Sequence, residues 1–462
     1  MCAALLESFA PDDPGPAPVE VDLVLTDIDW VVTGDEAARC IPSGGLAIEG
    51  DTLVGVGSKD WIQSRFVGRR TMDLSGHMVL PGLINTHTHA AMSCFRGLGD
   101  DLPLHRWLYE VVFPVESANV SPELVYWGTL LSIVEMLKNG VTTFCDGYFF
   151  EGSAARAALE SGIRAVLGQG ILDFPTPDQP DPSRFRNLAE GFIESFPRSS
   201  GRLRPSLFCH APYTCGPETL RWVKDLCREN GILFQIHLSE TAAEVEDLVR
   251  KHGERPAFYL DRLSILDSMT LCAHGVWLDQ NEVDLLALRG VGVSHTAESN
   301  MKLGCGVAPV PQLLSAGVSV GLGTDGCASN NNLDLFSEMD MVAKLHKVFQ
   351  HDPTVCPASS VFGMATRGGA AALGWSDEIG SLEAGKKADL VAIRLDRPHL
   401  TPLYDPISHL VYVVRGSDTR HVWVDGRQVV SDGHVLTVDE AEVMRNVAQF
   451  AWRIGRAREL SI

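Results

Sequence analysis

The stretch from Met78 to His89, MVLPGLINTHTH, is the part of this chain from which the fold can be inferred. It is an apolar run that ends in two histidines, His87 and His89. In a β-strand, side chains two residues apart lie on the same face, so the two imidazoles are expected to project together. Two imidazoles at the end of a buried strand can supply half of a metal site. Because an HxH pair alone is a weak signal, the interpretation depends on further ligands at comparable positions.

Seven more short apolar runs follow, and longer amphipathic stretches such as 121–140 and 278–290 separate them. The eight runs are MVLPGLINTHTH (78–89), VTTFCDGY (141–148), IRAVLGQGI (163–171), LRPSLFCHAPY (203–213), ILFQIHLSE (232–240), MTLCAHG (269–275), GVGVSH (290–295) and VSVGLGTDG (318–326). Strands that alternate with helices form a parallel sheet, and eight of them within about 250 to 300 residues indicate a closed (β/α)₈ barrel of the TIM type. The alternative is an open doubly wound sheet, but no GxGxxG motif begins the first helix.

The two ends of the chain show a different pattern, in which short β-like runs are separated by Gly and Asp turns. This pattern predicts a small β-sandwich domain in two parts, residues 21–79 and 376–440. The catalytic barrel, residues 80–375, is inserted between them. Residues 1–20 are rich in Pro and acidic residues and are expected to form a mobile leader, and residues 441–462 a C-terminal helix.

The composition is typical of a globular enzyme. The chain has 462 residues, of which 45% are hydrophobic and 21% charged, and its formal net charge is −21. Because nucleic acids and anionic membranes attract cations, neither is expected as a partner. The eleven cysteines form no CxxC pair, and the sequence contains neither a signal-peptide pattern nor an apolar run long enough to span a bilayer. A cytoplasmic location is therefore expected.

In TIM barrels the active site lies at the C-terminal ends of the strands, and most of the candidate side chains fall there. His87 and His89 end the first run, His237 lies at the end of the fifth, and Asp325 at the end of the eighth. Three neutral imidazoles and one carboxylate suit zinc, or ferrous iron, and leave one position open to water. We therefore predict that these four residues bind a divalent metal, zinc in preference to iron.

Glu240, shortly after His237, is predicted to carry protons, because a carboxylate that is not a ligand but lies beside the metal's open position is suited to that work. The alternative is a helix N-terminal Glu stabilised by the helix dipole, and both can hold. His274, at the end of the sixth run, is predicted to orient the attacking oxygen and to support developing charge. Asp325 is also predicted to accept a proton from the attacking water. His295, at the end of the seventh run, is expected to be structural.

Several motifs resemble the amidohydrolase superfamily, and within it the branch of deaminases and chlorohydrolases. They are PGLINTHTH, IHLSET, AHGVWL, ESNMKLG, APVPQLL, GLGTDGCASNNNLD and IGSLEAGKKADLV, and the resemblance covers nearly the whole chain from Val21 onwards. It implies a metal-dependent hydrolase. Binuclear relatives carry a carbamylated lysine at the end of the fourth run, and because this chain has none there, one metal per subunit is expected.

Within that branch, FRGLGDDLPLHRWLYEVVFPVE (95–116) is most similar to the deaminases of 5′-methylthioadenosine and S-adenosylhomocysteine. The resemblance implies that Glu116 hydrogen-bonds the ribose hydroxyls, since a carboxylate can accept from two adjacent hydroxyls. It further implies that His210 contacts the substrate, that Trp107 lines the pocket, and that Arg184 reaches the homocysteine carboxylate. The implied reaction is hydrolytic deamination of an adenine nucleoside to the inosine analogue and ammonia.

The sequence departs from the family pattern at two motifs. SHTAESN (294–300) stands in place of SHNPESN, and ATRGGA (365–370) in place of ATxNGA. Because of the first departure, the motifs do not determine which side chains form the pocket wall near the seventh run. They therefore do not determine the substrate.

Two alternative functions also remain open. One is an aminohydrolase or chlorohydrolase of another heteroaromatic ring, such as guanine, pterin, cytosine or s-triazine, and the other is a non-catalytic barrel scaffold. The preference among 5′-methylthioadenosine, S-adenosylhomocysteine and adenosine is not determined by these motifs. The resemblance also implies a possible homo-oligomer.

Overall fold

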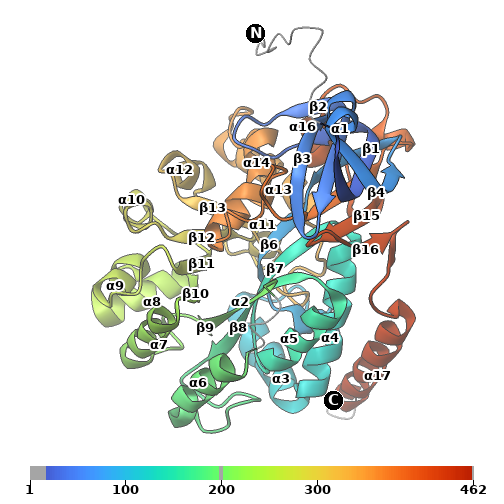
Figure 1. The fold of residues 1–462 in the computed structure, drawn as a ribbon. Coiled ribbons are helices and arrows are strands. Elements are labelled where there is room, and N and C mark those ends of the chain that lie inside the picture. The colour runs from blue at the N-terminus through green and yellow to red at the C-terminus, as the bar shows by residue number, and fades with distance from the viewer. Residues whose placement is uncertain (1–16, 197–200, 460–462) are drawn as a thin grey trace.

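The computed structural model describes residues 17–196 and 201–459, and its strands form two units (Figure 1). One unit is a closed barrel of parallel strands in the order β10-β11-β12-β13-β6-β7-β8-β9. Its strands are β6 (Leu83–Thr88), β7 (Val141–Tyr148), β8 (Arg164–Ile171), β9 (Leu203–Cys209), β10 (Leu233–Leu238), β11 (Thr270–His274), β12 (Gly292–His295) and β13 (Ser319–Leu322). The other unit is a mixed sheet built from both ends of the chain. The predicted fold class, a (β/α)₈ barrel with a small β-unit from both chain ends, is confirmed.

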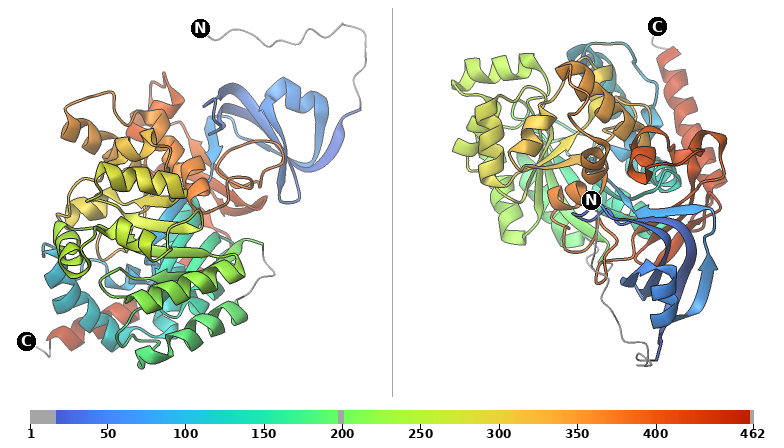
Figure 2. Two further views of the ribbon diagram at one scale, coloured as in Figure 1. Left: turned by 90° about the vertical axis from the view of Figure 1, so that its left-hand side faces the viewer. Right: turned by 90° about the horizontal axis from the view of Figure 1, so that it is seen from above.

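The mixed sheet joins the two ends of the chain through one antiparallel pair, in which Leu80 of β5 lies opposite Val391 of β14. Its strands are β1 (Val19–Val32), β2 (Cys40–Glu49), β3 (Thr52–Ser58), β4 (Phe66–Asp73), β5 (His77–Pro81), β14 (Leu390–Arg394), β15 (Thr419–Val424), β16 (Arg427–Ser431) and β17 (His434–Val435). Figure 2 shows the N-terminal strands standing beside the barrel rather than inside it. Residues 1–16 of the predicted leader lie outside the described residues, and the predicted domain boundaries stay predictions.

The stretch Met78–His89 belongs to both units, because β5 ends at Pro81 and β6 begins at Leu83. The residue between them, Gly82, packs so closely on Thr142 that a Cβ at this position would lie 2.0 Å from the threonine hydroxyl oxygen. Only glycine therefore fits where the chain passes from the sheet into the barrel. The apolar run crosses this junction and delivers its two histidines to the far end of β6.

Helices cover the outside of the barrel, and the sequence marks their ends. Helix α10 (Gln280–Arg289) begins with a capping box between Asp279 and Glu282 and ends at Gly290 in the left-handed conformation. The main surrounding helices are α4 (Pro122–Lys138), α5 (Glu151–Ser161), α6 (Phe185–Ser195), α7 (Pro217–Asn230), α8 (Ala242–His252), α9 (Pro256–Arg262), α12 (Val310–Ser315) and α13 (Leu335–Gln350). Every residue of β6, β7 and β8 is buried, which is why these strands read as continuous apolar runs.

Shorter elements connect these layers or lie near the barrel mouth. They are α1 (Lys59–Arg65), η1 (Ala90–Phe95), α2 (Leu104–Arg106), η2 (Trp107–Val112), α3 (Phe113–Asn119), η3 (Pro182–Arg184), α11 (Ala297–Lys302), α14 (Ala358–Gly363), η5 (Met364–Gly368), α15 (Gly369–Ala372), η6 (Pro398–Leu400), α16 (Pro406–Tyr412) and η7 (Gly416–Asp418). Helix α17 (Glu440–Glu459) lies against α4, where Glu440 pairs with Lys138 at 2.6 Å. Residues 460–462 of the predicted C-terminal helix lie outside the described residues.

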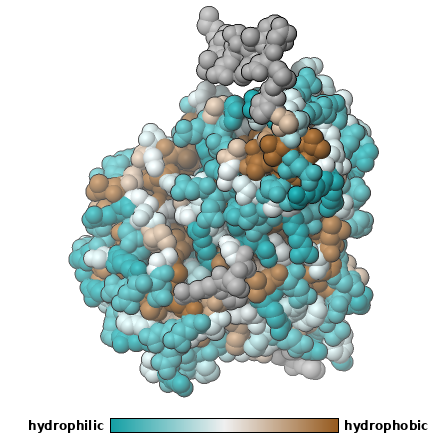
Figure 3. Space-filling view, in the orientation of Figure 1, coloured by the Kyte–Doolittle hydropathy of each residue, from teal (hydrophilic) through white to brown (hydrophobic). Residues whose placement is uncertain are grey.

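Hydrophilic residues cover most of the face in Figure 3, and the hydrophobic residues on it form separate patches. Among the described residues, none of the helices is both long and apolar enough to cross a membrane.

The buried guanidinium of Arg164 forms ion pairs between the barrel and the mixed sheet. Arg164, fully buried at the start of β8, donates to the Asp389 carboxylate from Nε at 2.7 Å and from Nη2 at 3.0 Å, and it also pairs with Asp425. Asp389 directly precedes β14, and Asp425 directly follows β15. Two carboxylates that flank strands of the sheet are therefore paired with one cation that belongs to the barrel.

Replacing this cation should destabilise the protein strongly. In Arg164→Met, Asp389 stays buried without its partner, and such a loss costs about 3–5 kcal/mol. Arg106→Met is the matched control, because Arg106 forms an exposed pair with Glu110 four residues away, and exposed pairs contribute little to stability. The free energy of unfolding in urea measures both effects, and equal losses in the two variants would contradict the role of Arg164.

Candidate metal centre and active-site cavity

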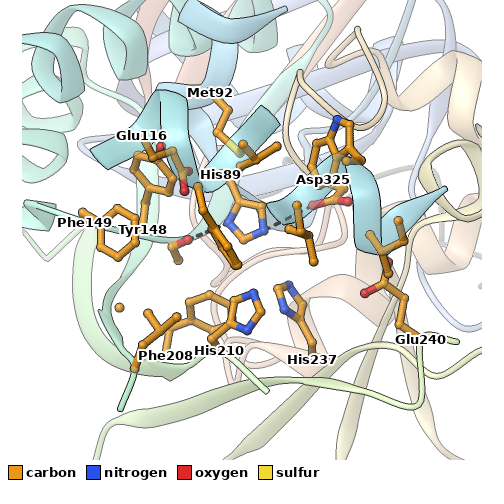
Figure 4. Close-up of a pocket in the computed structure, with 18 of the residues that line it drawn as sticks. His89, Met92, Glu116, Tyr148, Phe149, Phe208, His210, His237, Glu240 and Asp325 are labelled. Atoms are coloured by element: carbon orange, nitrogen blue, oxygen red, sulfur yellow. Dashed lines mark hydrogen bonds and ion pairs between the residues drawn. The ribbon is translucent and has the colours of Figure 1, made fainter. Parts of the chain in front are cut away.

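The C-terminal ends of the barrel strands open into a cavity, which Figure 4 shows in close-up. Most of the predicted site residues line it, namely His89, Trp107, Glu116, His210, His237, Glu240, His274 and Asp325. His87 lies just behind the lining and is 1% exposed. The cavity wall is otherwise largely apolar and aromatic, with Phe113, Phe208 and Tyr213 among its members.

Four predicted ligands converge at the floor of the cavity. Nε2 of His87 lies 3.2 Å from Nε2 of His237 and 3.5 Å from Oδ1 of Asp325. Nε2 of His89 lies 3.3 Å from the same carboxylate oxygen. In a tetrahedral zinc site with Zn–N distances of about 2.0–2.1 Å, neighbouring ligand atoms are about 3.3–3.4 Å apart. The three distances given come close to that spacing. Donor atoms of His87, His89 and Asp325 all lie within 4.8 Å of one another, and so do those of His87, His237 and His274. Imidazole nitrogens and a carboxylate are ligands that suit a divalent metal.

Burial sets the charge of these groups. It lowers the pKa of His87 to about 4 and holds the pKa of His237 well below its usual range, so both imidazoles are neutral near pH 7. Burial alone would raise the pKa of Asp325, but the hydrogen bond with His87 and the neighbouring histidines keep it well below the ordinary value. Neutral imidazoles and an ionised carboxylate are the forms that bind a metal.

Hydrogen bonds behind the cluster fix the orientation of its members. Nδ1 of His89 donates to the carbonyl oxygen of Gly147 at 2.6 Å, which leaves Nε2 free to face Asp325. Oδ2 of Asp325 accepts from the hydroxyls of Ser299 at 2.6 Å and Ser329 at 2.7 Å. Sequence reasoning missed both serines, although they lie in the ESNMKLG and GLGTDGCASNNNLD motifs that carried the family resemblance.

Three strand ends at the site have an unusual backbone. Ser239, His274 and Asp325 have φ angles of 51°, 72° and 61°, in the left-handed region that residues other than glycine rarely adopt. Such conformations cost about 1–3 kcal/mol each, and they cluster where a side chain must be aimed at a functional site. Here they turn the chain sharply at the ends of β10 and β11 and just beyond β13.

Glu240 and His274 form a second pair beside the metal cluster. Glu240 is 7% exposed, and its burial raises the pKa of its carboxyl group. Its Oε2 lies 3.9 Å from Nε2 of His274, and its Oε1 accepts from the Cys305 thiol at 3.6 Å. Burial alone would lower the pKa of His274, but the charges of Glu240 and Asp325 raise it. A carboxyl group and an imidazole are thus placed where both can exchange protons with a bound molecule.

A buried carboxyl group stands on the opposite side of His89 from Asp325 (Figure 4). Glu116, in α3, is 5% exposed, and burial raises its pKa to about 7. The Tyr148 hydroxyl donates to Glu116 Oε1 at 2.6 Å. Sequence reasoning missed Tyr148, although it ends the second apolar run and so falls where a barrel places its site residues.

Of the remaining residues singled out in the sequence, some line the cavity and others do not. His210 lines the cavity, its Nδ1 lies 2.9 Å from the Thr214 hydroxyl, and burial lowers its pKa to about 3. Trp107 lines the cavity too, and within the described residues its indole N–H has no hydrogen-bond partner. Arg184 is exposed in η3 and does not line the cavity. His295 also lies outside the lining, with Nε2 3.3 Å from Nε2 of His346.

Comparisons with known proteins agree with this geometry. A family model described as the Amidohydrolase family matches residues 78–429. A 5-methylthioadenosine/S-adenosylhomocysteine deaminase from Syntrophobacter fumaroxidans is 47% identical over 430 residues, which cover 93% of this chain and 98% of the relative. Another, from Thermodesulfovibrio yellowstonii, is 43% identical over 92% of this chain and 97% of the relative.

Solved structures show the same likeness. The crystal structure of an adenosine deaminase from Xanthomonas campestris with bound zinc is 36% identical, with a TM-score of 0.92, and the match covers 95% of this chain and 100% of that one. An atrazine chlorohydrolase from Arthrobacter aurescens, complexed with zinc, is 24% identical with a TM-score of 0.86, over 93% of this chain and 100% of that one. The second likeness is one of fold alone.

The matched region contains all four predicted metal ligands and the whole barrel. The resemblance inferred from the motifs, to the superfamily and to the methylthioadenosine and adenosylhomocysteine deaminases within it, is confirmed. The chain belongs to the Amidohydrolase family.

Proposed function

We propose that this chain catalyses the hydrolytic deamination of an adenine nucleoside, namely 5′-methylthioadenosine, S-adenosylhomocysteine or adenosine, to the inosine analogue and ammonia. As a member of its family, it is a hydrolase that acts on carbon–nitrogen bonds. The observation that carries the proposal is a single cavity lined by three of the four predicted metal ligands, by the buried carboxyl group of Glu240 and, beyond His89, by that of Glu116. The relatives named for methylthioadenosine and adenosylhomocysteine support this substrate class.

One zinc ion per subunit would be held by His87, His89, His237 and Asp325. When bound, zinc supplies Lewis acidity, which lowers the pKa of water to about 7. The zinc in the Xanthomonas campestris structure supports zinc over iron.

Proton transfer falls to the chain's own carboxyl and imidazole groups. Glu240 takes a proton from the attacking water and delivers it to N1 of the purine, which makes C6 electrophilic; its raised pKa suits both halves of this exchange. His274, beside Glu240, steadies the oxygen that attacks C6. Asp325 helps to transfer a proton to the amine that leaves. Each of these groups is buried, so the charges act in a medium of low dielectric constant.

Substrate binding falls to the other side of the cavity. Glu116 would accept hydrogen bonds from both ribose hydroxyls, while Tyr148 holds one oxygen of its carboxyl group in place. The indole N–H of Trp107 is available to an acceptor on the substrate. His210, neutral because it is buried, presents an imidazole to the same space.

The alternatives make different demands on the cavity. A hydrolase of guanine, pterin, cytosine or s-triazine needs no partner for ribose, whereas Glu116 offers one. A non-catalytic scaffold needs neither the metal cluster nor the strained strand ends that aim its side chains. Glu116 therefore favours a nucleoside as the substrate, and the metal ligands and strained strand ends favour an enzyme over a scaffold.

Substrate class is tested by ammonia release from the zinc-loaded protein over a panel. Methylthioadenosine, adenosylhomocysteine and adenosine should be deaminated, whereas adenine, guanine, cytosine and an aminotriazine should react far more slowly because they lack ribose. Preferred turnover of a free base would favour the heteroaromatic alternative. A zinc-loaded protein inactive on every compound would favour the scaffold.

Glu240→Gln should abolish most of the turnover, since the amide cannot carry a proton. We expect kcat to fall about 10²–10⁴-fold, the range that general acid–base catalysis contributes. Zinc content and the unfolding midpoint should match the wild type. Glu218→Gln, at an exposed side chain paired with Arg186, is the matched control and should leave kcat unchanged. Near-normal kcat in Glu240→Gln would refute the proton-carrier role.

Glu116→Gln should weaken nucleoside binding and spare zinc. A hydrogen bond to a charged group contributes about 1.5–3 kcal/mol, so KM should rise at least about tenfold while kcat changes little. The pKa of Glu116 near 7 adds a pH dependence. Below that pH the carboxyl group is protonated and loses acceptor capacity, so the wild-type KM should rise on acidification. The variant should lack this rise, and an unchanged KM would exclude the ribose role.

A further inference from the structure

His274 is held at its Nδ1 by two side chains to which the proposed reaction gives no role. Oδ1 of Asn300 and Oγ1 of Thr296 each lie 2.9 Å from this nitrogen. Thr296 is 0% exposed and Asn300 is 1% exposed. Neither residue lines the cavity, but both contact the His274 imidazole, which does.

The chemistry of the three groups determines where the proton of the ring lies. With the amide oxygen of Asn300 facing the ring, as in this structure, Nδ1 of His274 carries a hydrogen and donates it, because an amide oxygen only accepts. The Thr296 hydroxyl oxygen can accept from the same N–H, and its own hydrogen has an acceptor in Asn300 Oδ1 at 3.4 Å. The nitrogen left to the cavity is Nε2, which lies 3.9 Å from Glu240 Oε2.

One short segment, residues 296–300, contacts both His274 and Asp325. Thr296 directly precedes α11, and Asn300 lies within it. Ser299 of the same helix donates to Oδ2 of Asp325 at 2.6 Å. The segment thus holds a predicted metal ligand through one residue and His274 through two others. It also contains the SHTAESN departure, in which Thr296 stands where the family pattern has Asn.

We propose that Thr296, together with Asn300, is a positioning residue that holds His274 with Nδ1 protonated and Nε2 directed at the reacting atoms. The inference rests on the proposed function, in which His274 steadies the attacking oxygen. A hydroxyl that contacts neither the substrate nor the metal cluster affects turnover through the direction of Nε2. It does not affect the affinity for the substrate.

Thr296→Val keeps the shape of the side chain and removes only the hydroxyl. We expect kcat for the preferred nucleoside to fall about 10–100-fold, the effect usual for a residue that orients a functional group, while KM and zinc content stay at wild-type values. Thr296→Ser, which returns the hydroxyl, should recover most of the turnover. Thr366→Val is the matched control, because it removes an equally buried hydroxyl that bonds to the Phe362 carbonyl oxygen instead. Wild-type kcat in Thr296→Val, or failure of Thr296→Ser to recover it, would overturn the proposal.

A readout that needs no turnover separates this proposal from the proposed function. In zinc-loaded protein with nitrogen-15 histidine, the resonances of His274 can be identified by their loss in His274→Gln. We expect its neutral ring to carry the proton on Nδ1. A neutral ring protonated on Nε2 would overturn the inference even in an active enzyme. If no nucleoside releases ammonia, the proposed function fails, while this measurement still tests how the ring is held.

Discussion

Closure of the barrel between its last strand and its first is the constraint on which the site depends. Leu322 of β13 pairs with Asn85 of β6, and three residues further on the backbone N–H of Asp325 donates to the carbonyl oxygen of His87 at 3.0 Å. That hydrogen bond brings the carboxylate of the last run to the histidines of the first. His237 reaches the same point from β10, on the other side of the barrel order. If the barrel did not close, the ligands would remain separate side chains at strand ends.

Burial then gives each group of the cavity its chemical character. The same loss of water that lowers the pKa of His237 raises that of Glu240, so a neutral imidazole and a carboxyl group of raised pKa exist side by side. Asp325 stays ionised against its burial because histidines surround it. The site needs rigid support for this arrangement, which comes from Ser299 and Ser329 behind Asp325 and from the left-handed turns at the strand ends.

The mixed sheet is joined to the barrel by a few short-range features rather than by a long linker. Gly82 allows β5 and β6 to follow one another against Thr142, and Arg164 of the barrel pairs with two aspartates that flank strands of the sheet. The stretch Met78–His89 therefore has two roles. Its first half is a strand of the sheet, and its second half places the first two residues of the metal cluster.

The pattern of the sequence was sufficient for the barrel, for the accessory sheet and for the residues that converge at the strand ends. Alternating apolar runs reflect strands buried on both faces, and the ends of parallel strands must meet at one end of a barrel, so His87, His237 and Asp325 could be grouped from local pattern alone. Glu116 was proposed only because of a family resemblance, since a single carboxylate on a helix has no pattern of its own.

Tertiary structure alone revealed the contacts that hold these groups. Tyr148 meets Glu116 across 32 residues of sequence, and Thr296 meets His274 across 22. Such pairs leave no periodic signal, because each hydroxyl meets its partner only when two segments far apart in the sequence lie at the same end of the barrel. For Arg184, the family resemblance suggested a contact with the substrate, whereas the structure places this residue exposed and outside the cavity lining. Periodicity along the chain determines where strands end, whereas the packing of the loops beyond those ends decides which side chains touch.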